Sequence, residues 1–146
     1  MCTTASGGRL PPLWPFEFNL TRDRGATREV FGRGWEGLTL HPLDVVRRPR
    51  VDSARLGELT SASPLGKLLA DGSRRWLARS RWRHGSRGFP VWDLPAALDC
   101  VGALDGRRER VAVPPALRRL TGRAEIDCLV DFDPDGAWRR FLAPVG

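Results

Sequence analysis

The chain has 146 residues, of which 41% are hydrophobic. This content suits a globular core in one domain or in two small halves, and it excludes a fully disordered chain. The net charge of +7 and the pI of about 11.0 suit a nucleic acid or another polyanion as partner, and they also suit plain solubility. Because the 23 arginines and single lysine are typical of a GC-rich genome, the positions of the arginines are more informative than their number.

The sequence lacks the features of a membrane protein or a metalloprotein. No hydrophobic run approaches the roughly 18 residues of a membrane span, and the N-terminus has no hydrophobic signal core. The three cysteines have no CxxC spacing, and His41 and His84 are solitary. We therefore expect a cytoplasmic protein with free, buried thiols, no membrane contact, no metal site and no cofactor.

The first 30 residues are predicted to form a loose arm and an edge strand. Residues 1–12 are small, polar and rich in proline and glycine. Residues 14–20 alternate between hydrophobic and polar side chains, which predicts a strand with one buried face, and Pro15 favours an edge position. The charged residues 21–29 are predicted to be a connection.

A second strand region is predicted at residues 34–46, and a helix follows it. Ser63 is suited to the N-cap of this helix, Pro64 to its first position and Gly72 to its end. Residues 73–82 are predicted to restart the helix. The predicted hydrophobic stripe of the helix comprises Leu65, Leu68 and Leu69.

Residues 93–113 are predicted to form two strands, joined by a hairpin turn at Asp105-Gly106. A short helix at residues 114–122 follows, with Gly122 at its C-terminal cap. Residues 124–132 then alternate as a strand with one buried face. The side chains predicted to share that face are Ile126, Cys128, Val130 and Phe132.

The stretch DFDPDG, residues 131–136, begins like a calcium loop of the EF-hand kind. Such a loop needs a bidentate glutamate at its twelfth position, which is Leu142 here, and a helix before it, where we predict a strand. Asp133-Pro134-Asp135-Gly136 also has the residue types of a tight turn. We therefore predict a hairpin turn at this place and no calcium site.

Two segments, starting at Leu43 and Leu104, resemble each other. Their Leu-Asp pairs are 61 positions apart, and each has an acidic turn, arginines, a strand and a short helix in the same order. These elements predict an α+β, β-rich fold of two short halves with short helices. The predicted divisions are residues 1–30 for the arm and edge strand, residues 31–88 for a first half with a basic helix, and residues 89–146 for a second half.

The second copy resembles the AbrB-like swapped-hairpin module, mainly over residues 96–142. The residues that stand at matching motif positions are Arg110-Val111, Pro114, Leu117-Arg118 and Leu120-Thr121-Gly122. Glu109 replaces the glycine of the motif, and Asp105 is one position too far from the arginine. Two tandem copies are similar to the MraZ proteins of cell-division and cell-wall gene clusters. The resemblance implies a homo-oligomer, because a swapped hairpin closes its core with a second chain, and it implies DNA binding by the arginine-bearing hairpin.

Six arginines and no acid lie between Gly72 and Trp92, together with Trp76 and Trp82. Two interpretations are open. The arginines contact phosphates while the tryptophans stack on bases, or the tryptophans enter the core while the arginines stay solvated, because Trp76 continues the stripe of Leu65. The candidate nucleic-acid-binding residues are Arg74, Arg75, Arg79, Arg81 and Arg83 of this run, and Arg107, Arg108 and Arg110 of the predicted hairpin.

The sequence contains no catalytic motif, and the pair of His41 and Asp44 is the one candidate proton relay, so we expect no enzyme. We predict a DNA-binding transcriptional regulator that forms a homo-oligomer. The alternative is an adaptor or assembly component that holds another protein through its tryptophans. Binding to DNA would weaken steeply with salt, and we expect the hairpin pair Arg107 and Arg108 to contribute more to it than Arg74 and Arg75.

Overall fold

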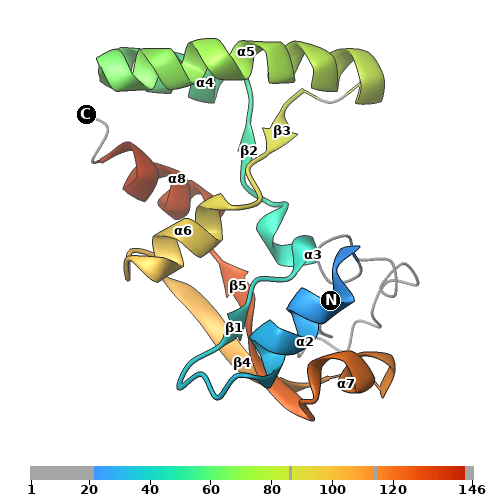
Figure 1. Cartoon of the computed structure of the whole chain (residues 1–146). Helices are drawn as coiled ribbons and strands as arrows, with labels where there is room; N and C mark the ends of the chain where they lie inside the picture. Colours follow the sequence, from blue (N-terminus) through green and yellow to red (C-terminus); the bar gives the residue numbers. More distant parts are fainter. Residues whose placement is uncertain (1–21, 86, 114, 144–146) are drawn as a thin grey trace. The chain divides into compact units, whose positions relative to one another are not determined.

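The computed structural model describes residues 22–85, 87–113 and 115–143, and for residues 83, 84, 116 and 117 it describes the backbone alone. Within these ranges the chain forms seven helices and five strands (Figure 1). The predicted α+β class is confirmed. The prediction of a β-rich chain is overstated, because three of the five strands have only two residues. The strand predicted at residues 14–20 lies outside the described residues.

The chain divides into two compact units, and each is built from two separate stretches of sequence. The first comprises the described residues of Met1–Val45 together with Gly106–Asp131, and the second comprises Val46–Asp105 together with the described residues of Phe132–Gly146. The units therefore differ from the three consecutive divisions expected from the sequence. The reason is that elements near the end of the chain complete both units.

The first unit contains a three-stranded sheet. Its elements in chain order are α2 (Arg24–Gly32), β1 (Thr39–Leu40), β4 (Gly106–Ala112), α7 (Pro115–Thr121) and β5 (Glu125–Phe132), and α3 (Leu43–Val46) leads out of it. The order of the strands is β1-β5-β4, so that β5 lies in the middle. β1 runs parallel to β5, with Thr39 opposite Asp127 and Leu40 opposite Cys128.

β4 and β5 run in opposite directions, and α7 connects them. The amide of Val113 donates to the carbonyl oxygen of Ala124 at 2.8 Å, and the side chain of Arg110 bonds that of Asp127. Residue 113 therefore lies near residue 124 and residue 110 lies near residue 127. The two strands are thus numbered in opposite directions, and the pair is antiparallel. Gly122, with a φ of 67°, ends α7 as predicted.

The core of the first unit confirms the predicted face of β5. Ile126, Cys128 and Val130 are buried and pack with Phe31 of α2. Leu129, on the opposite face, is also fully buried, so both faces are covered at the centre of the strand. An alternating pattern predicts one buried face, and only tertiary packing reveals the second.

α2 corrects the prediction of a charged connection at residues 21–29. Asp23 caps the helix, because its carboxylate accepts a hydrogen bond from the amide of Ala26 at 2.9 Å. Thr27 and Phe31, which are four residues apart, are the two buried side chains of this helix. These two residues lie one helical turn apart in a charged segment. That spacing alone is too weak a signal to predict the helix from the sequence.

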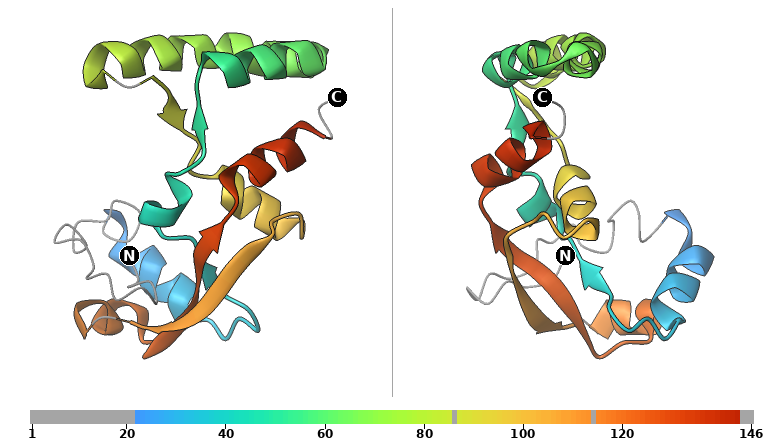
Figure 2. Two further views of the ribbon diagram at one scale, coloured as in Figure 1. Left: turned by 180° about the vertical axis from the view of Figure 1, so that it is seen from behind. Right: turned by 90° about the vertical axis from the view of Figure 1, so that its left-hand side faces the viewer.

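The second unit contains two long helices that pack side by side, as the views from several directions show (Figure 2). Its elements are β2 (Arg50–Val51), α4 (Ser53–Ala62), α5 (Pro64–His84), β3 (Phe89–Pro90), α6 (Leu94–Cys100) and α8 (Pro134–Leu142). β2 and β3 form an antiparallel pair. Gly88 lies beside this pair, and a Cβ atom on it would stand 2.9 Å from the carbonyl oxygen of Val51.

α5 starts where the sequence predicts, and it ends later. The hydroxyl of Ser63 accepts a hydrogen bond from the amide of Gly66 at 3.0 Å, which confirms the N-cap. Gly72 does not stop the helix, which continues to Gly85, whose φ of 58° allows the left-handed cap. One glycine inside a helix costs only about 1 kcal/mol, and the packing of Leu77 beyond it offsets this cost.

α6 corrects the prediction that residues 93–113 form two strands joined by a hairpin. Pro95 lies in the first turn of α6, where a missing amide proton costs no hydrogen bond. Leu98 is buried, and Gly102, with a φ of 68°, follows the end of the helix. Only the second half of the predicted hairpin, β4, is a strand.

α8 corrects the prediction of a hairpin turn at residues 131–136. Asp133 is an N-cap that accepts a hydrogen bond from the amide of Asp135 at 2.9 Å, and Pro134 is the first residue of the helix. The same residue types serve turns and helix starts, and the buried pair of Ala137 and Trp138 decides for a helix. The closing hairpin that the resemblance to the AbrB-like module implies is therefore not formed at these residues, which form a helix.

The two similar segments share an order of elements but not a strand pairing. Arg50-Val51 lies in β2 and is followed by α4, and Arg110-Val111 lies in β4 and is followed by α7. β2 pairs with β3, whereas β4 pairs with β5. Among the helices of the described residues, none combines the length and the apolar character that crossing a bilayer needs.

Candidate functional site

α5 has two different hydrophobic faces, and one of them is exposed. The buried face consists of Gly66, Ala70 and Leu77, whose separations of four and seven residues place them on one side of the helix. Ala70 and Leu77 belong to the core of the second unit. These small and medium-sized residues allow α4 and α5 to pack closely.

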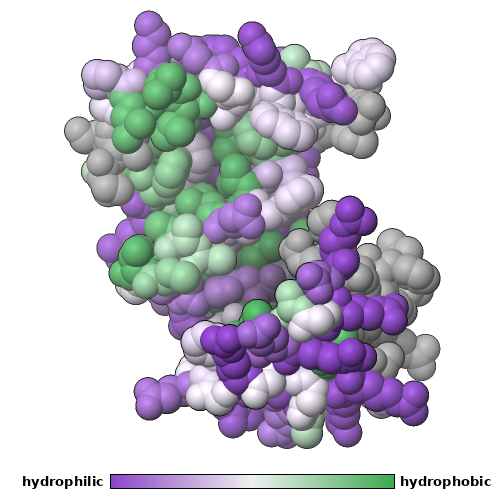
Figure 3. Space-filling model, viewed as in Figure 1, coloured by the Kyte–Doolittle hydropathy of each residue, from purple (hydrophilic) through white to green (hydrophobic). Residues whose placement is uncertain are grey.

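The exposed face carries the leucines of the hydrophobic stripe that was predicted from the sequence. We call the residues of this face the apolar stripe: Leu65, Leu68, Leu69, Gly72 and Trp76. Leu68 is 69% exposed and Trp76 is 63% exposed. Trp76 does continue the line of the leucines, as the spacing predicts, but the line points to solvent because the core face lies on the other side of the helix. The interpretation in which Trp76 and Trp82 enter the core is therefore wrong. In the space-filling view, a hydrophobic patch lies over the end of the upper helix pair where α5 begins (Figure 3).

A shallow groove of about 510 Å³ continues the stripe toward the end of α5. It is lined by Arg75, Trp76, Ala78, Arg79 and Trp82. Trp82 is 83% exposed, which is unusual for the largest hydrophobic side chain. The groove combines two guanidinium groups with two indole rings, so it offers both charge and flat apolar area to a partner.

The arginines of α5 differ in whether their guanidinium groups already bond another residue of the chain. Arg74 donates to the carboxylate of Asp71 at 3.2 Å, and Arg81 donates to the hydroxyl of Ser53 at 2.6 Å. Within the described ranges, Arg75 and Arg79 make no hydrogen bond and no ion pair. The side chain of Arg83 lies outside the described residues. Among the arginine side chains described on this helix, Arg75 and Arg79 are therefore the most available to a partner.

The second group of candidate arginines lies on strand β4, which corrects the prediction that they project from a turn. Arg110 makes two hydrogen bonds of 2.9 Å to the carboxylate of Asp127 on β5. This bidentate pair holds the pKa of Asp127 below its ordinary value and raises the pKa of Arg110. Arg107 forms an ion pair with Glu109, and Arg108 donates to the carbonyl oxygen of Gly106 at 3.2 Å. Much of the positive charge of β4 is thus balanced within the strand pair.

Carboxylates of the DFDPDG stretch already bond other residues of the chain. Asp133 caps α8 and pairs with Arg139 at 3.3 Å, and the amide of Gly136 is the main reason why its pKa is lowered. Asp135 forms an ion pair with Arg55. Within the described part of the chain, no three side chains of the types that bind metals gather at one point.

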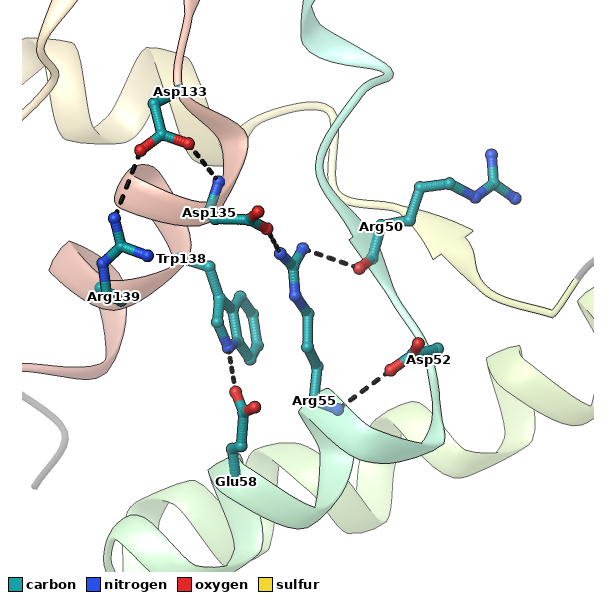
Figure 4. A network of polar contacts seen from close by, with 8 residues as sticks. All are labelled: Arg50, Asp52, Arg55, Glu58, Asp133, Asp135, Trp138 and Arg139. Atoms are coloured by element: carbon teal, nitrogen blue, oxygen red, sulfur yellow. Dashed lines mark hydrogen bonds and ion pairs between the residues drawn. The ribbon is translucent and has the colours of Figure 1, made fainter.

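The contacts of Arg55 form a polar network that sequence reasoning missed (Figure 4). Its guanidinium group lies 5.2 Å from the centre of the Trp138 ring and donates to the carbonyl oxygen of Arg50 at 2.9 Å. Trp138 in turn donates its indole N–H to Glu58 at 2.6 Å. The network joins α4, β2 and α8, so its role is to hold the second unit together. The separation of about 80 positions between partners leaves no local signal in the sequence.

The remaining candidates are Asp44, the two described cysteines and a second hollow. Oδ1 of Asp44 is buried and has no hydrogen-bond partner among the described residues. Cys128 is buried, as predicted, whereas Cys100 is exposed, and neither forms a disulfide among the described residues. A second hollow of about 380 Å³ is lined in part by Asp133 and Arg139, which already bond each other.

Comparisons of the chain with protein-family models, with curated proteins and with solved structures find no match.

Proposed function

We propose that this chain is a non-enzymatic protein-binding component, an adaptor or assembly protein, and that the apolar stripe of α5 is its docking surface. The observation that supports the proposal is the exposure of Leu68 and Trp76 on one face of a regular helix. Contiguous exposed hydrophobic residues are typical of protein interfaces, and tryptophan is among the side chains that contribute most to binding. The leucines favour a protein partner over a nucleic acid, because single-stranded nucleic-acid sites rely on cations and aromatic rings.

The arginines at the end of the stripe fit the same function. Long arginine side chains cover apolar surface with their methylene groups and keep their charge at the rim. Arg75 and Arg79 line the groove together with Trp76 and Trp82. A hydrophobic centre with a polar rim is the usual arrangement of a protein–protein interface.

Affinity capture from cells of the source, followed by reconstitution with the purified captured protein, tests this proposal. The double substitution Leu68→Ser and Trp76→Ser is expected to lose the partner, and the circular dichroism spectrum is expected to stay the same. Trp92→Ser is the matched control, because Trp92 is a tryptophan of the same unit, 53% exposed, that lies outside α5. If wild type and the double variant captured the same proteins with the same affinity, the proposal would be wrong.

A second candidate function, a DNA-binding transcriptional regulator of the AbrB or MraZ type, is favoured by one observation. Arg75 and Arg79 are exposed, make no polar contact within the described ranges, and lie in a run of sequence without acids from Gly72 to Trp92. Arg107 and Arg110, by contrast, have acidic partners on their own strand pair. We therefore now expect the α5 pair, not the β4 pair, to contribute more to any DNA binding.

Fluorescence anisotropy with a labelled DNA duplex at several salt concentrations tests this second candidate. Removing Arg75 and Arg79 is expected to lower the slope of log K against log salt by roughly one to two, because each lost phosphate contact releases about one counterion fewer. The double alanine variant of Arg107 and Arg108 is the matched control. If the wild type shows no binding at low salt, the regulator function is excluded.

A cytoplasmic location belongs to the same proposal. Its support is the exposed thiol of Cys100, which forms no disulfide among the described residues and which an oxidising compartment would tend to pair or modify. Alkylation of the protein in intact cells, followed by mass spectrometry, is expected to find this thiol reduced.

A further inference from the structure

Gly72 occupies the centre of the apolar stripe, and the fold of the chain itself does not require a glycine there. A Cβ atom on Gly72 would meet no atom within 4 Å, and the residue lies in regular helix without a positive φ. Glycine is unfavourable inside a helix compared with alanine. Leu68 and Trp76, each four residues away, lie nearly in line with it along the helix. A small residue between two large hydrophobic ones is suited to the close approach of a second helix.

We infer that this second helix is α5 of another copy of the same chain, antiparallel and crossing at Gly72. The inference rests on the proposed function and names its partner. In such a pair, residues equally far from Gly72 on opposite sides face each other. Leu68 of one copy then packs against Trp76 of the second copy, and both Leu68–Trp76 contacts form at once around the two-fold axis.

The outer positions of the stripe are complementary in the same arrangement. Leu65, seven residues before Gly72, faces Arg79 of the second copy, and Leu69 faces Arg75. The methylene groups of each arginine can cover the leucine while the guanidinium group reaches solvent. The apolar stripes of two copies are therefore complementary when the two α5 helices are antiparallel.

The distribution of charge along α5 decides against a parallel pair. The helix carries one lysine and one aspartate from Pro64 to Gly72, and five arginines without an acid from Ser73 to His84. A parallel pair would place the two arginine-rich ends side by side, where like charges repel. An antiparallel pair places each arginine-rich end beside the nearly neutral end of the other helix.

The size of the face is sufficient for a reversible dimer. A helix of 21 residues is about 31 Å long. With the exposed Trp76 and the three leucines of the stripe, each copy offers on the order of 500 Å² of apolar surface. The pair would bury about 1,000 Å² in total, near the lower limit of specific interfaces, so we expect a dissociation constant on the order of micromolar.

Light scattering of the purified full chain across concentrations around this value tests the inference. The mass is expected to rise from 16.3 kDa toward twice that value. Because each chain carries a net charge of +7, salt is expected to strengthen the association, which separates it from binding to a polyanion. Gly72→Gln is expected to weaken the association at least tenfold, because a long side chain at the crossing point keeps the helices apart.

Gly57→Gln is the matched control for the crossing point. Gly57 is also an exposed helical glycine whose Cβ would meet nothing within 4 Å, but it lies on α4. Its substitution is expected to leave the association unchanged. Equal weakening by both substitutions would overturn the assignment of Gly72 to the interface.

Disulfide formation tests the direction of the helices, in a chain whose Cys2 and Cys100 are replaced by serine. Gly72→Cys is expected to link two chains readily, because both copies of residue 72 lie at the crossing point within the roughly 4–7 Å between Cα atoms that a disulfide spans. Leu65→Cys is expected to link poorly, because the two copies of residue 65 are about 21 Å apart in an antiparallel pair. Efficient linkage at residue 65 would show a parallel pair and overturn the inference.

The failure of this inference can be told apart from the failure of the proposed function. A wild type that stays monomeric, yet captures another protein in a way that depends on Leu68 and Trp76, would overturn the self-pairing and leave the docking function intact. A monomer that captures nothing through the stripe would overturn both.

Discussion

Removal of the Arg55 side chain should destabilise the second unit more than removal of any other arginine of α4 or α5. Arg55 is 17% exposed and has three partners: the carboxylate of Asp135, the carbonyl oxygen of Arg50 and the ring of Trp138. These partners come from two other elements, β2 and α8 (Figure 4). Arg55→Ala removes all three contacts and leaves the N-cap bond of Asp52, which uses the main-chain amide, in place.

The expected loss follows from the exposure of each partner. A partly desolvated cation–π contact contributes about 1 kcal/mol, and a hydrogen bond from a charged donor to a carbonyl contributes about 1.5 kcal/mol. The ion pair with Asp135 adds only about 0.5 kcal/mol, because that carboxylate is 72% exposed. The sum is about 3 kcal/mol, and for a chain of this size about 1 kcal/mol corresponds to roughly 3 °C in melting temperature. We therefore expect a decrease of about 9 °C.

Circular dichroism melts of the wild type, Arg55→Ala and Arg74→Ala measure this effect. Arg74→Ala is the matched control, because Arg74 makes an ion pair in which both side chains are more than half exposed. It should change the melting temperature by less than about 2 °C. If Arg55→Ala changed it as little as the control, the network of Figure 4 would not hold α8 to α4 in solution.

Three further predictions concern the backbone and the acidic stretch. Gly88→Ala should destabilise the protein by about 1–3 kcal/mol in a denaturant titration, because the new Cβ stands 2.9 Å from the carbonyl oxygen of Val51, while Gly57→Ala should be neutral or stabilising. Because folding lowers the pKa of Asp133, the ionised carboxylate stabilises the folded protein. This stabilisation is complete above the ordinary pKa of 3.8 and is lost as the pH falls through the lower pKa of the folded state. Between neutral and acidic pH, the melting temperature of Asp133→Asn should therefore decline less steeply than that of the wild type. Calcium should leave the melting temperature unchanged relative to a chelator, because Asp133 and Asp135 already bond Arg139 and Arg55, and a rise that Asp133→Ala abolished would contradict this.

Local signals in the sequence predicted some elements correctly. The start of α5 at Ser63 and Pro64 and the end of α7 at Gly122 depend on capping geometry, which neighbouring residues determine. The buried face of β5 was predicted by its alternation. These features need no knowledge of the rest of the chain.

The errors have a common physical cause, which is that the deciding contact lies far away in the sequence. Asp133-Pro134 can start a turn or a helix, and the burial of Trp138 against residues about 80 positions earlier decides between them. The exposure of Trp76 depends in the same way on which side of α5 meets α4. The stripe itself could be predicted from its spacing, but its burial could not.

The way in which the chain passes back and forth between its two units has a consequence for synthesis on the ribosome. β5 is the central strand of the first unit, and Trp138 of α8 belongs to the core of the second. Both elements come from residues 125–142, so neither unit has its full core until this stretch has left the exit tunnel. Until these residues emerge, both cores of the nascent chain are incomplete, and chaperones could bind it during this time. A premature stop codon shortly before residue 125 would cost the protein both units at once.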